Sequence, residues 1–305
     1  MQLIRKALVS LGICSVIFAS AHAEPTIREF YVGTTPYQMY VQHWLVPSGK
    51  PVRPAPVVMI HGGVHTGTAW TTQPDGQPGW APRFVDGGWP VYVVDWPGVG
   101  RSGFWPETLA TGADNVVDAL IALLERTGSA VLIGHSIGGA LSFKVAEKRP
   151  DLVRAIVALA PASMEVPSTA VPTAAPDKPV IVTREVALQR FANSELFPKA
   201  NFDDYFRFLV PYSPRIRNAA VGANDELKLD RKRLDIWKQV PVLFLVAEED
   251  RTVPNALSEE TAKIMGLQQI LLGRDWGMPG HGHLFIIEKG NDAIAKRVQD
   301  WVAAK

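Results

Sequence analysis

The chain has 305 residues, of which 47% are hydrophobic and 20% are charged, a composition typical of a globular protein with one large or two small domains. Lys and Arg number 31 against 30 Asp and Glu, a formal net charge of +1 at pH 7. This balance gives no reason to expect nucleic acid or an anionic membrane surface as a partner. After the first two dozen residues, no stretch is apolar for long enough to span a bilayer.

The first residues are typical of a secretory signal peptide. Two basic residues precede an apolar run over residues 7–18, and the small residues of Ala21-His22-Ala23 follow. We expect cleavage after Ala23, no stable membrane anchor, and export to a bacterial periplasm or the medium. The only cysteine, Cys14, lies in this segment, so the mature chain is expected to have no disulfide, thiol nucleophile or thiolate metal site.

Apolar runs that alternate with helical patterns follow the signal segment. Residues 26–46 alternate in polarity and are rich in Tyr, Phe and Val, which predicts two antiparallel strands. Continuous apolar runs predict strands that are covered on both faces; they lie at residues 56–60, 89–95, 130–133, 153–159, 241–246 and 269–272. Helices are expected at residues 115–126, 138–148 and 291–304. Strands that alternate with helices indicate a mostly parallel sheet with helices on both faces.

The segment over residues 161–240 interrupts this alternation. It opens with a tract rich in Pro, Ala, Thr and Ser at residues 167–179 and continues with helix-like stretches that carry Phe and Tyr. We expect a mainly helical cap, inserted between two core strands rather than folding alone. The core would then comprise residues 24–160 and 241–305.

A Gly-x-Ser-x-Gly sequence, Gly134-His135-Ser136-Ile137-Gly138, joins a predicted strand to the helix after it. At such a tight turn the serine has a strained backbone and its hydroxyl projects above the sheet. Side chains at Gly134 and Gly138 would collide with the neighbouring strand and helix. Ser136 is therefore the predicted nucleophile, and the free N–H groups of the following helix face the negative charge that develops during attack.

A serine nucleophile needs a base that takes its proton and a third group that orients the base. In an α/β sheet such residues lie at the carboxyl ends of the strands. His283 follows the last predicted strand and is the predicted base, with His281 as the alternative. Asp250 follows the strand before it and is the predicted acid.

These motifs resemble those of the α/β-hydrolases over essentially the whole mature chain. The matching pieces are His61-Gly62-Gly63, the run from Asp95 to Ser102, Gly134 to Gly139, Glu249-Asp250-Arg251 and Gly282-His283. The chain order Ser136, Asp250, His283 is that of the family. The resemblance implies an α/β-hydrolase fold with a serine nucleophile, but it says little about the substrate, because this fold hosts many reactions.

A narrower resemblance links the chain to a group of secreted bacterial serine esterases. It is carried by the loop from His61 to Trp80 and by the ending Gly282-His283-Leu284-Phe285. In that group the acid is a glutamate after the strand that follows the nucleophile, but here that strand ends without a carboxylate. Glu165 lies a few residues further on and is the alternative to Asp250. The family implies a structural role for His61, and no metal or other cofactor is expected.

Two backbone N–H groups are needed to stabilise the oxyanion that forms on attack. The predicted donors are Ile137, directly after the nucleophile, and Gly63, in the loop after His61. Tryptophans in loops at this end of the sheet, Trp70 and Trp96 among them, predict an apolar or aromatic substrate pocket together with the phenylalanines of the cap. His135, next to the nucleophile, is a further predicted substrate contact.

The sequence thus predicts a secreted serine hydrolase that cleaves a small apolar or aromatic carboxylic ester through an acyl-enzyme. The same triad would serve a lactone, an amide or a carbon–carbon bond, and a non-catalytic binding protein of this fold is the alternative from another class. The expected partner is a small-molecule ester, and the sequence is compatible with a homodimer.

Overall fold

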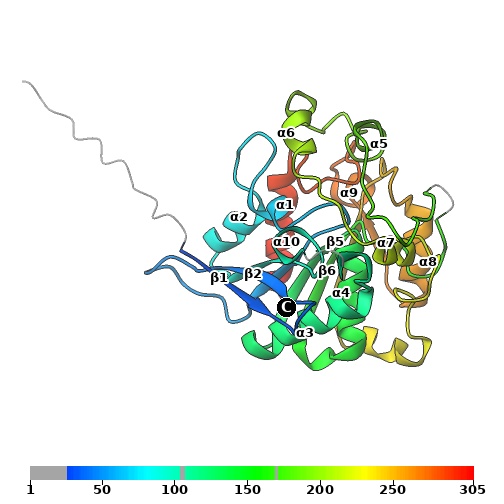
Figure 1. Cartoon of the computed structure of the whole chain (residues 1–305). Helices are drawn as coiled ribbons and strands as arrows, with labels where there is room; N and C mark the ends of the chain where they lie inside the picture. The colour runs from blue at the N-terminus through cyan, green and yellow to red at the C-terminus, as the bar shows by residue number, and fades with distance from the viewer. Residues whose placement is uncertain (1–25, 104–106, 169–170) are drawn as a thin grey trace, which may run out of the picture.

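An eight-stranded sheet lies at the centre of the computed structural model, which describes residues 26–103, 107–168 and 171–305 (Figure 1). The predicted signal peptide and its cleavage site at Ala23 lie outside the described residues. The strand order is β1-β2-β4-β3-β5-β6-β7-β8. The strands are β1 (Ile27–Val32), β2 (Met39–Trp44), β3 (Val57–Ile60), β4 (Val91–Asp95), β5 (Ala130–His135), β6 (Val153–Leu159), β7 (Val242–Val246) and β8 (Gln269–Leu271).

Strands β1 and β2 are antiparallel, β2 runs antiparallel to β4, and all other neighbouring strands are parallel. Every residue of β3 and β5 is buried, because layers of helices cover both faces of the central strands. The edge strand β1 is mostly exposed. The α/β-hydrolase fold predicted from the sequence is confirmed.

The helices fall into two groups on opposite faces of the sheet. Helix α2 (Trp80–Asp86) connects β3 to β4, whereas α3 (Ala113–Thr127) and α4 (Ile137–Lys148) belong to crossovers that run the other way along the sheet. Because such crossovers are right-handed, helices of opposite direction cover opposite faces. Helix α3 packs against α4, and α2 packs against α10 (Asn291–Ala303); Figure 1 shows α3 and α4 together in front of the sheet.

The chain between β6 and β7, residues 160–241, is called here the β6–β7 segment. It contains short helices and no strand of the main sheet among its described residues; they are α5 (Arg184–Val186), Ala187–Phe191, Lys199–Asn201, α6 (Phe202–Phe206), α7 (Pro214–Ala220) and Arg231–Lys238. Figure 1 shows α5 and α6 above one end of the sheet. One side of the cavity described below is built from this segment.

Several short helices were not predicted from the sequence. They are α1 (Thr68–Thr71), α2, α8 (Asn255–Ile264), α9 (Leu272–Trp276), Gly100–Ser102, Glu107–Leu109 and Pro150–Leu152. The sequence predicts a long loop that includes residues 73–80, and α2 begins only at the end of that stretch. Within the described part of the chain, no helix is long and apolar enough to cross a membrane.

Candidate active site

Ser136 lies at the sharp turn between β5 and α4, with φ 54° and ψ −120°. A non-glycine residue rarely adopts this conformation, and it persists only where its surroundings impose it. Two glycines allow the turn: a Cβ on Gly134 would lie 2.3 Å from the Gly138 carbonyl oxygen, and one on Gly138 would lie 2.4 Å from that of Ile60. The strained turn exposes the serine side chain to the cavity that it lines.

His283 is held by the Asp250 carboxylate. Its Nδ1 lies 2.7 Å from Asp250 Oδ2, and only 2% and 1% of the two side chains are exposed. The other carboxylate oxygen, Oδ1, accepts hydrogen bonds from the backbone N–H groups of Thr252 (2.7 Å) and Val253 (2.8 Å). The carboxylate therefore has a fixed orientation and holds the imidazole with Nδ1 as the donor and Nε2 available as a base.

Glu165, the alternative acid, lies elsewhere. Its carboxylate pairs with the Arg231 guanidinium, and it lines a separate small pocket next to Val166. The structure brings Asp250, and not Glu165, to the predicted base.

His281, the alternative base, does not line the cavity either. Its Nδ1 lies 2.9 Å from Glu288 Oε2, and the side chain of Glu288 is fully buried. The same carboxylate accepts hydrogen bonds from the N–H of Gly282 (3.0 Å) and from Ser194 Oγ (2.8 Å). Glu288 thus fixes the two residues that precede His283, and no sequence motif indicated this role.

One cavity of about 490 Å³ brings the predicted site residues together. Ser136, His283, Gly63, Ile137 and His135 all line it. Ile137 is the first residue of α4, and the N–H groups of a first helical turn have no acceptor within the helix. The cavity walls thus contain the predicted nucleophile, the predicted base and the predicted backbone donors for an oxyanion, the parts that acyl transfer would require.

The loop that carries Gly63 is held in a strained conformation. Val64 has φ 59°, a genuine outlier for a β-branched residue. His65 Nδ1 lies 2.8 Å from the Gly63 carbonyl oxygen, and its Nε2 lies 3.2 Å from the Tyr205 hydroxyl on α6. Burial lowers the pKa of His65 to about 4, so the ring is neutral, with Nδ1 donating to Gly63 and Nε2 accepting from Tyr205.

His61 connects this loop to the end of β4. The backbone N–H of Trp96 donates to His61 Nε2 (3.3 Å), and the Nδ1 of His61 faces the Gly62 carbonyl oxygen (2.8 Å). Burial lowers the pKa of His61 to about 4, so a single neutral tautomer satisfies both contacts.

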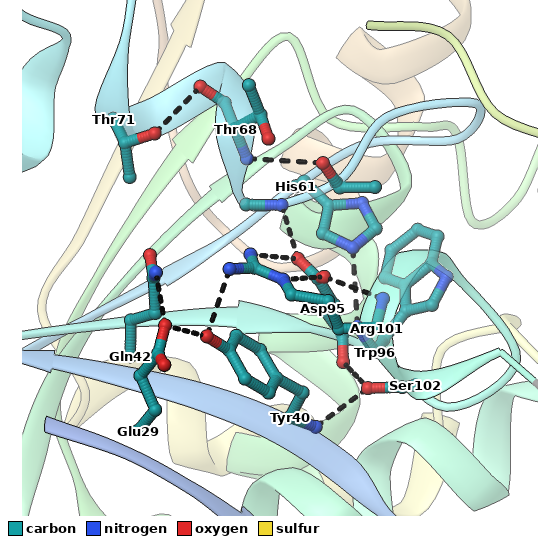
Figure 2. Close-up of polar contacts among 12 residues, drawn as sticks. Glu29, Tyr40, Gln42, His61, Thr68, Thr71, Asp95, Trp96, Arg101 and Ser102 are labelled. Atoms are coloured by element: carbon teal, nitrogen blue, oxygen red, sulfur yellow. Dashed lines mark hydrogen bonds and ion pairs between the residues drawn. The ribbon is translucent and has the colours of Figure 1, made fainter.

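Figure 2 shows the charged network that stabilises the neighbouring loops. The Asp95 carboxylate accepts hydrogen bonds from the N–H of Gly67 (2.8 Å) and from the Arg101 N–H (3.0 Å) and Nε (2.8 Å). Burial alone would raise the pKa of Asp95, but the hydrogen bonds from Arg101 outweigh it and lower that pKa. The Tyr40 hydroxyl accepts from Arg101 Nη1 (3.0 Å) and donates to Glu29. The family motif from Asp95 to Ser102 is thus a structural clamp beside the site.

His135 contacts the predicted base directly. Its Nε2 donates to the backbone carbonyl of His283 (2.9 Å), and the two rings lie 4.7 Å apart. Burial lowers the pKa of His135 well below the usual value, so the ring is neutral. His135 therefore both lines the cavity and positions the His283 backbone.

The tryptophans predicted to bind substrate are not on the cavity wall. Trp70 and Trp96 have no exposed surface and belong to the hydrophobic core. Trp70 packs against Trp80 with tilted rings (centroids 6.0 Å apart), and Trp96 packs against His61 (4.2 Å). Complete burial removes more apolar surface from water than a place on a cavity wall does, so Trp70 and Trp96 pack in the core and, contrary to the prediction, do not line the cavity.

The chain belongs to the α/β-hydrolase family, whose model matches residues 57–297. A probable secreted lipase, phiG, of Fungal sp. (strain ATCC 74256) is 27% identical in an alignment that covers 99% of this chain and 98% of that protein. Lipase LipV of Mycobacterium tuberculosis (strain ATCC 25618 / H37Rv) is 37% identical over 38% of this chain and 39% of its own length. The solved structure of esterase RhEst1 from Rhodococcus sp. ECU1013 superposes with a TM-score of 0.65, covering 91% of this chain and 98% of that one at 20% identity.

Proposed function

We propose that this protein is a secreted serine esterase that cleaves a carboxylic ester with Ser136, His283 and Asp250. The observation that carries the proposal is the 2.7 Å contact between His283 and the buried Asp250 carboxylate, in a protein whose strained Ser136 lines the same cavity as His283. The lipase and esterase names of the similar proteins support ester chemistry.

In the proposed reaction, Ser136 Oγ attacks the ester carbonyl carbon and its proton passes to His283 Nε2. The N–H groups of Gly63 and Ile137 stabilise the oxyanion, and losing one such donor typically costs on the order of 3 kcal/mol of transition-state stabilisation. Collapse of the intermediate releases the alcohol, which takes the proton from His283. Water, activated by the same imidazole, then hydrolyses the acyl-enzyme and frees the acid.

Asp250 holds His283 in the tautomer that accepts the serine proton. The β6–β7 segment acts as the cap, because it supplies one wall of the cavity above Ser136. Export is supported by the signal-like pattern of residues 1–23 and by the printed name of the secreted lipase phiG.

The first test is covalent labelling of the purified protein with a fluorophosphonate probe, followed by hydrolysis of p-nitrophenyl esters of graded chain length. We expect labelling at Ser136 and turnover of at least one ester. Both should be lost in Ser136→Ala, whose fold is checked by circular dichroism. A folded wild-type protein that is not labelled would contradict the proposal and favour a non-catalytic binding protein.

A further inference from the structure

The cavity wall carries positive charge that the proposed mechanism does not use. Its described lining residues include Lys178, Arg190 and Arg217, but no Asp or Glu. Burial keeps His65 and His135 neutral by lowering their pKa values. The positive charge on the wall therefore belongs to the arginines and the lysine, all in the β6–β7 segment.

Arg217 on α7 is the informative member of this group. Its side chain is partly buried, and its Nη2 donates to the backbone carbonyl of Pro172 (3.1 Å). Among the described residues, no carboxylate lies within ion-pair distance of this guanidinium. Burial lowers the pKa of Arg217, Tyr212 opposes this effect and the nearby charge of Arg190 adds to it. A desolvated charge of this kind is unfavourable until an anion pairs with it.

The neighbouring arginine of the same helix shows the contrast. Arg215 Nε lies 2.5 Å from Glu226 Oε1, outside the cavity, in an ion pair in which the arginine side chain is half exposed. Helix α7 therefore carries one arginine with a carboxylate partner and another that lines the cavity beside a second arginine. Arg215 provides a matched control for Arg217.

Tyr212 relates the Arg217 charge to the reaction centre. A Cβ built on Gly63 would lie 3.1 Å from the Tyr212 hydroxyl oxygen, so this hydroxyl borders the predicted oxyanion loop. Burial raises the pKa of Tyr212 to about 12, and the positive charge of Arg217 opposes that rise. The charge of the Arg217 guanidinium thus acts on the Tyr212 hydroxyl, which borders Gly63. Both side chains line the cavity that a bound substrate would occupy.

We infer that the ester this site accepts carries a carboxylate, which pairs with the Arg217 guanidinium beside the charge of Arg190. This inference rests on the proposed esterase function and narrows its substrate class. The planar guanidinium matches a carboxylate in geometry and charge. The remaining wall is largely apolar, with Val171, Val180 and Ile181 among its residues. A half-ester of an aliphatic dicarboxylic acid combines both features.

Binding tests the inference without requiring turnover. The Ser136→Ala protein is titrated in a calorimeter with monomethyl adipate and with dimethyl adipate, which differ in one negative charge. A hydrogen bond to a charged group contributes about 1.5–3 kcal/mol, so the half-ester should bind about 10- to 100-fold more tightly. Adding Arg217→Gln should remove this preference and Arg217→Lys should retain part of it. Adding Arg215→Gln should leave the preference intact.

Equal affinity for the two esters would overturn the inference, as would a preference that survives Arg217→Gln in a folded protein.

Kinetic measurements then distinguish the proposed substrate class from the proposed esterase function. The wild-type protein is assayed with the 4-nitrophenyl monoester of adipic acid and with the methyl ester of that compound. A higher kcat/KM for the anionic substrate supports the inference; equal values refute it while sustaining the esterase proposal. Failure to cleave either ester, with the binding preference intact, refutes the esterase proposal alone.

Discussion

Replacing Asp250 by Asn changes the hydrogen bonds around His283 while keeping the side chain nearly the same shape. The carboxylate accepts from His283 Nδ1 (2.7 Å) and from the N–H groups of Thr252 (2.7 Å) and Val253 (2.8 Å). An asparagine has a single acceptor oxygen. If that oxygen keeps the two backbone N–H groups, the amide NH₂ faces His283 Nδ1. The imidazole must then carry its proton on Nε2, where it cannot accept the proton of Ser136.

This change of tautomer sets the expected magnitude. The corresponding substitution in serine proteases lowers kcat on the order of 10⁴-fold, about 5 kcal/mol at 1.36 kcal/mol for each factor of ten. We expect a loss of similar size for Asp250→Asn, in kcat more than in KM, because the imidazole acts in the chemical steps. Initial rates at saturating p-nitrophenyl ester measure it, and urea unfolding shows whether the variant is folded.

Glu248 supplies the matched control. It also follows β7, and its carboxylate accepts from the backbone N–H groups of Gly273 (2.9 Å) and Arg274 (2.8 Å), yet it has no hydrogen bond to a histidine among the described residues. Glu248→Gln should therefore keep kcat close to that of the wild type. Retention of more than about a tenth of kcat in folded Asp250→Asn would refute the reasoning, since the wrong tautomer should block proton transfer almost completely. Loss of activity in Glu165→Gln would refute it as well.

Three further predictions concern stability and positioning. Burial lowers the pKa of His61 and of His65 to about 4, below the usual 6.5, so the unfolded chain binds protons at a higher pH than the folded one. Each neutral ring therefore contributes roughly 3 kcal/mol to the free energy of unfolding, a contribution that is present above pH 6.5 and lost as the pH falls toward 4. A urea midpoint unchanged between pH 7 and pH 5 would contradict this. Glu288→Gln should leave a buried donor unpaired, at a cost of about 1–3 kcal/mol, and should therefore lower the thermal unfolding temperature. It should also lower kcat, because the chain before His283 shifts. A variant equal to wild type in unfolding temperature and in kcat would show that the contact with His281 is dispensable. Gly138→Ala should prevent folding, as its Cβ would lie 2.4 Å from a backbone oxygen, so a native-like circular dichroism spectrum would contradict the turn geometry.

The core elements were predictable from the sequence because their signals are local. A continuous apolar run marks each central parallel strand, and β6 begins and ends where the pattern predicted. Helix α3 was recognised from its apolar spacing, and Gly128 ends it with φ 86° as expected of a glycine at that position. The helices that were missed have seven residues or fewer, apart from α8 with ten, so periodicity has too few residues to act on in most of them.

The candidate site was only partly predictable. Ser136, Asp250 and His283 each lie at the end of a recognisable strand or loop motif, and topology then brings such ends to one edge of the sheet. Arg217 and Glu288 have no such marker, because their surroundings come from chain segments distant in sequence. Residue type and a place in a loop at this end of the sheet predicted Trp70 as a substrate contact, but neither shows whether a side chain faces the core or a cavity.

The β6–β7 segment is better understood as part of the site than as a separate lid. Hydrogen bonds join it to the loops that carry the predicted catalytic residues, and three of them are Tyr205 Oη to His65 Nε2 (3.2 Å), Val210 N–H to Val64 O (2.8 Å) and Ser194 Oγ to Glu288 Oε1 (2.8 Å). The first two hold the strained loop that presents the Gly63 N–H, and the third fixes the chain before His283. The strain at Val64 persists only because this surrounding structure imposes it. Since the same segment also supplies Arg217, the proposed oxyanion stabilisation and the proposed substrate preference depend on one element, so that a change in its position would alter both together.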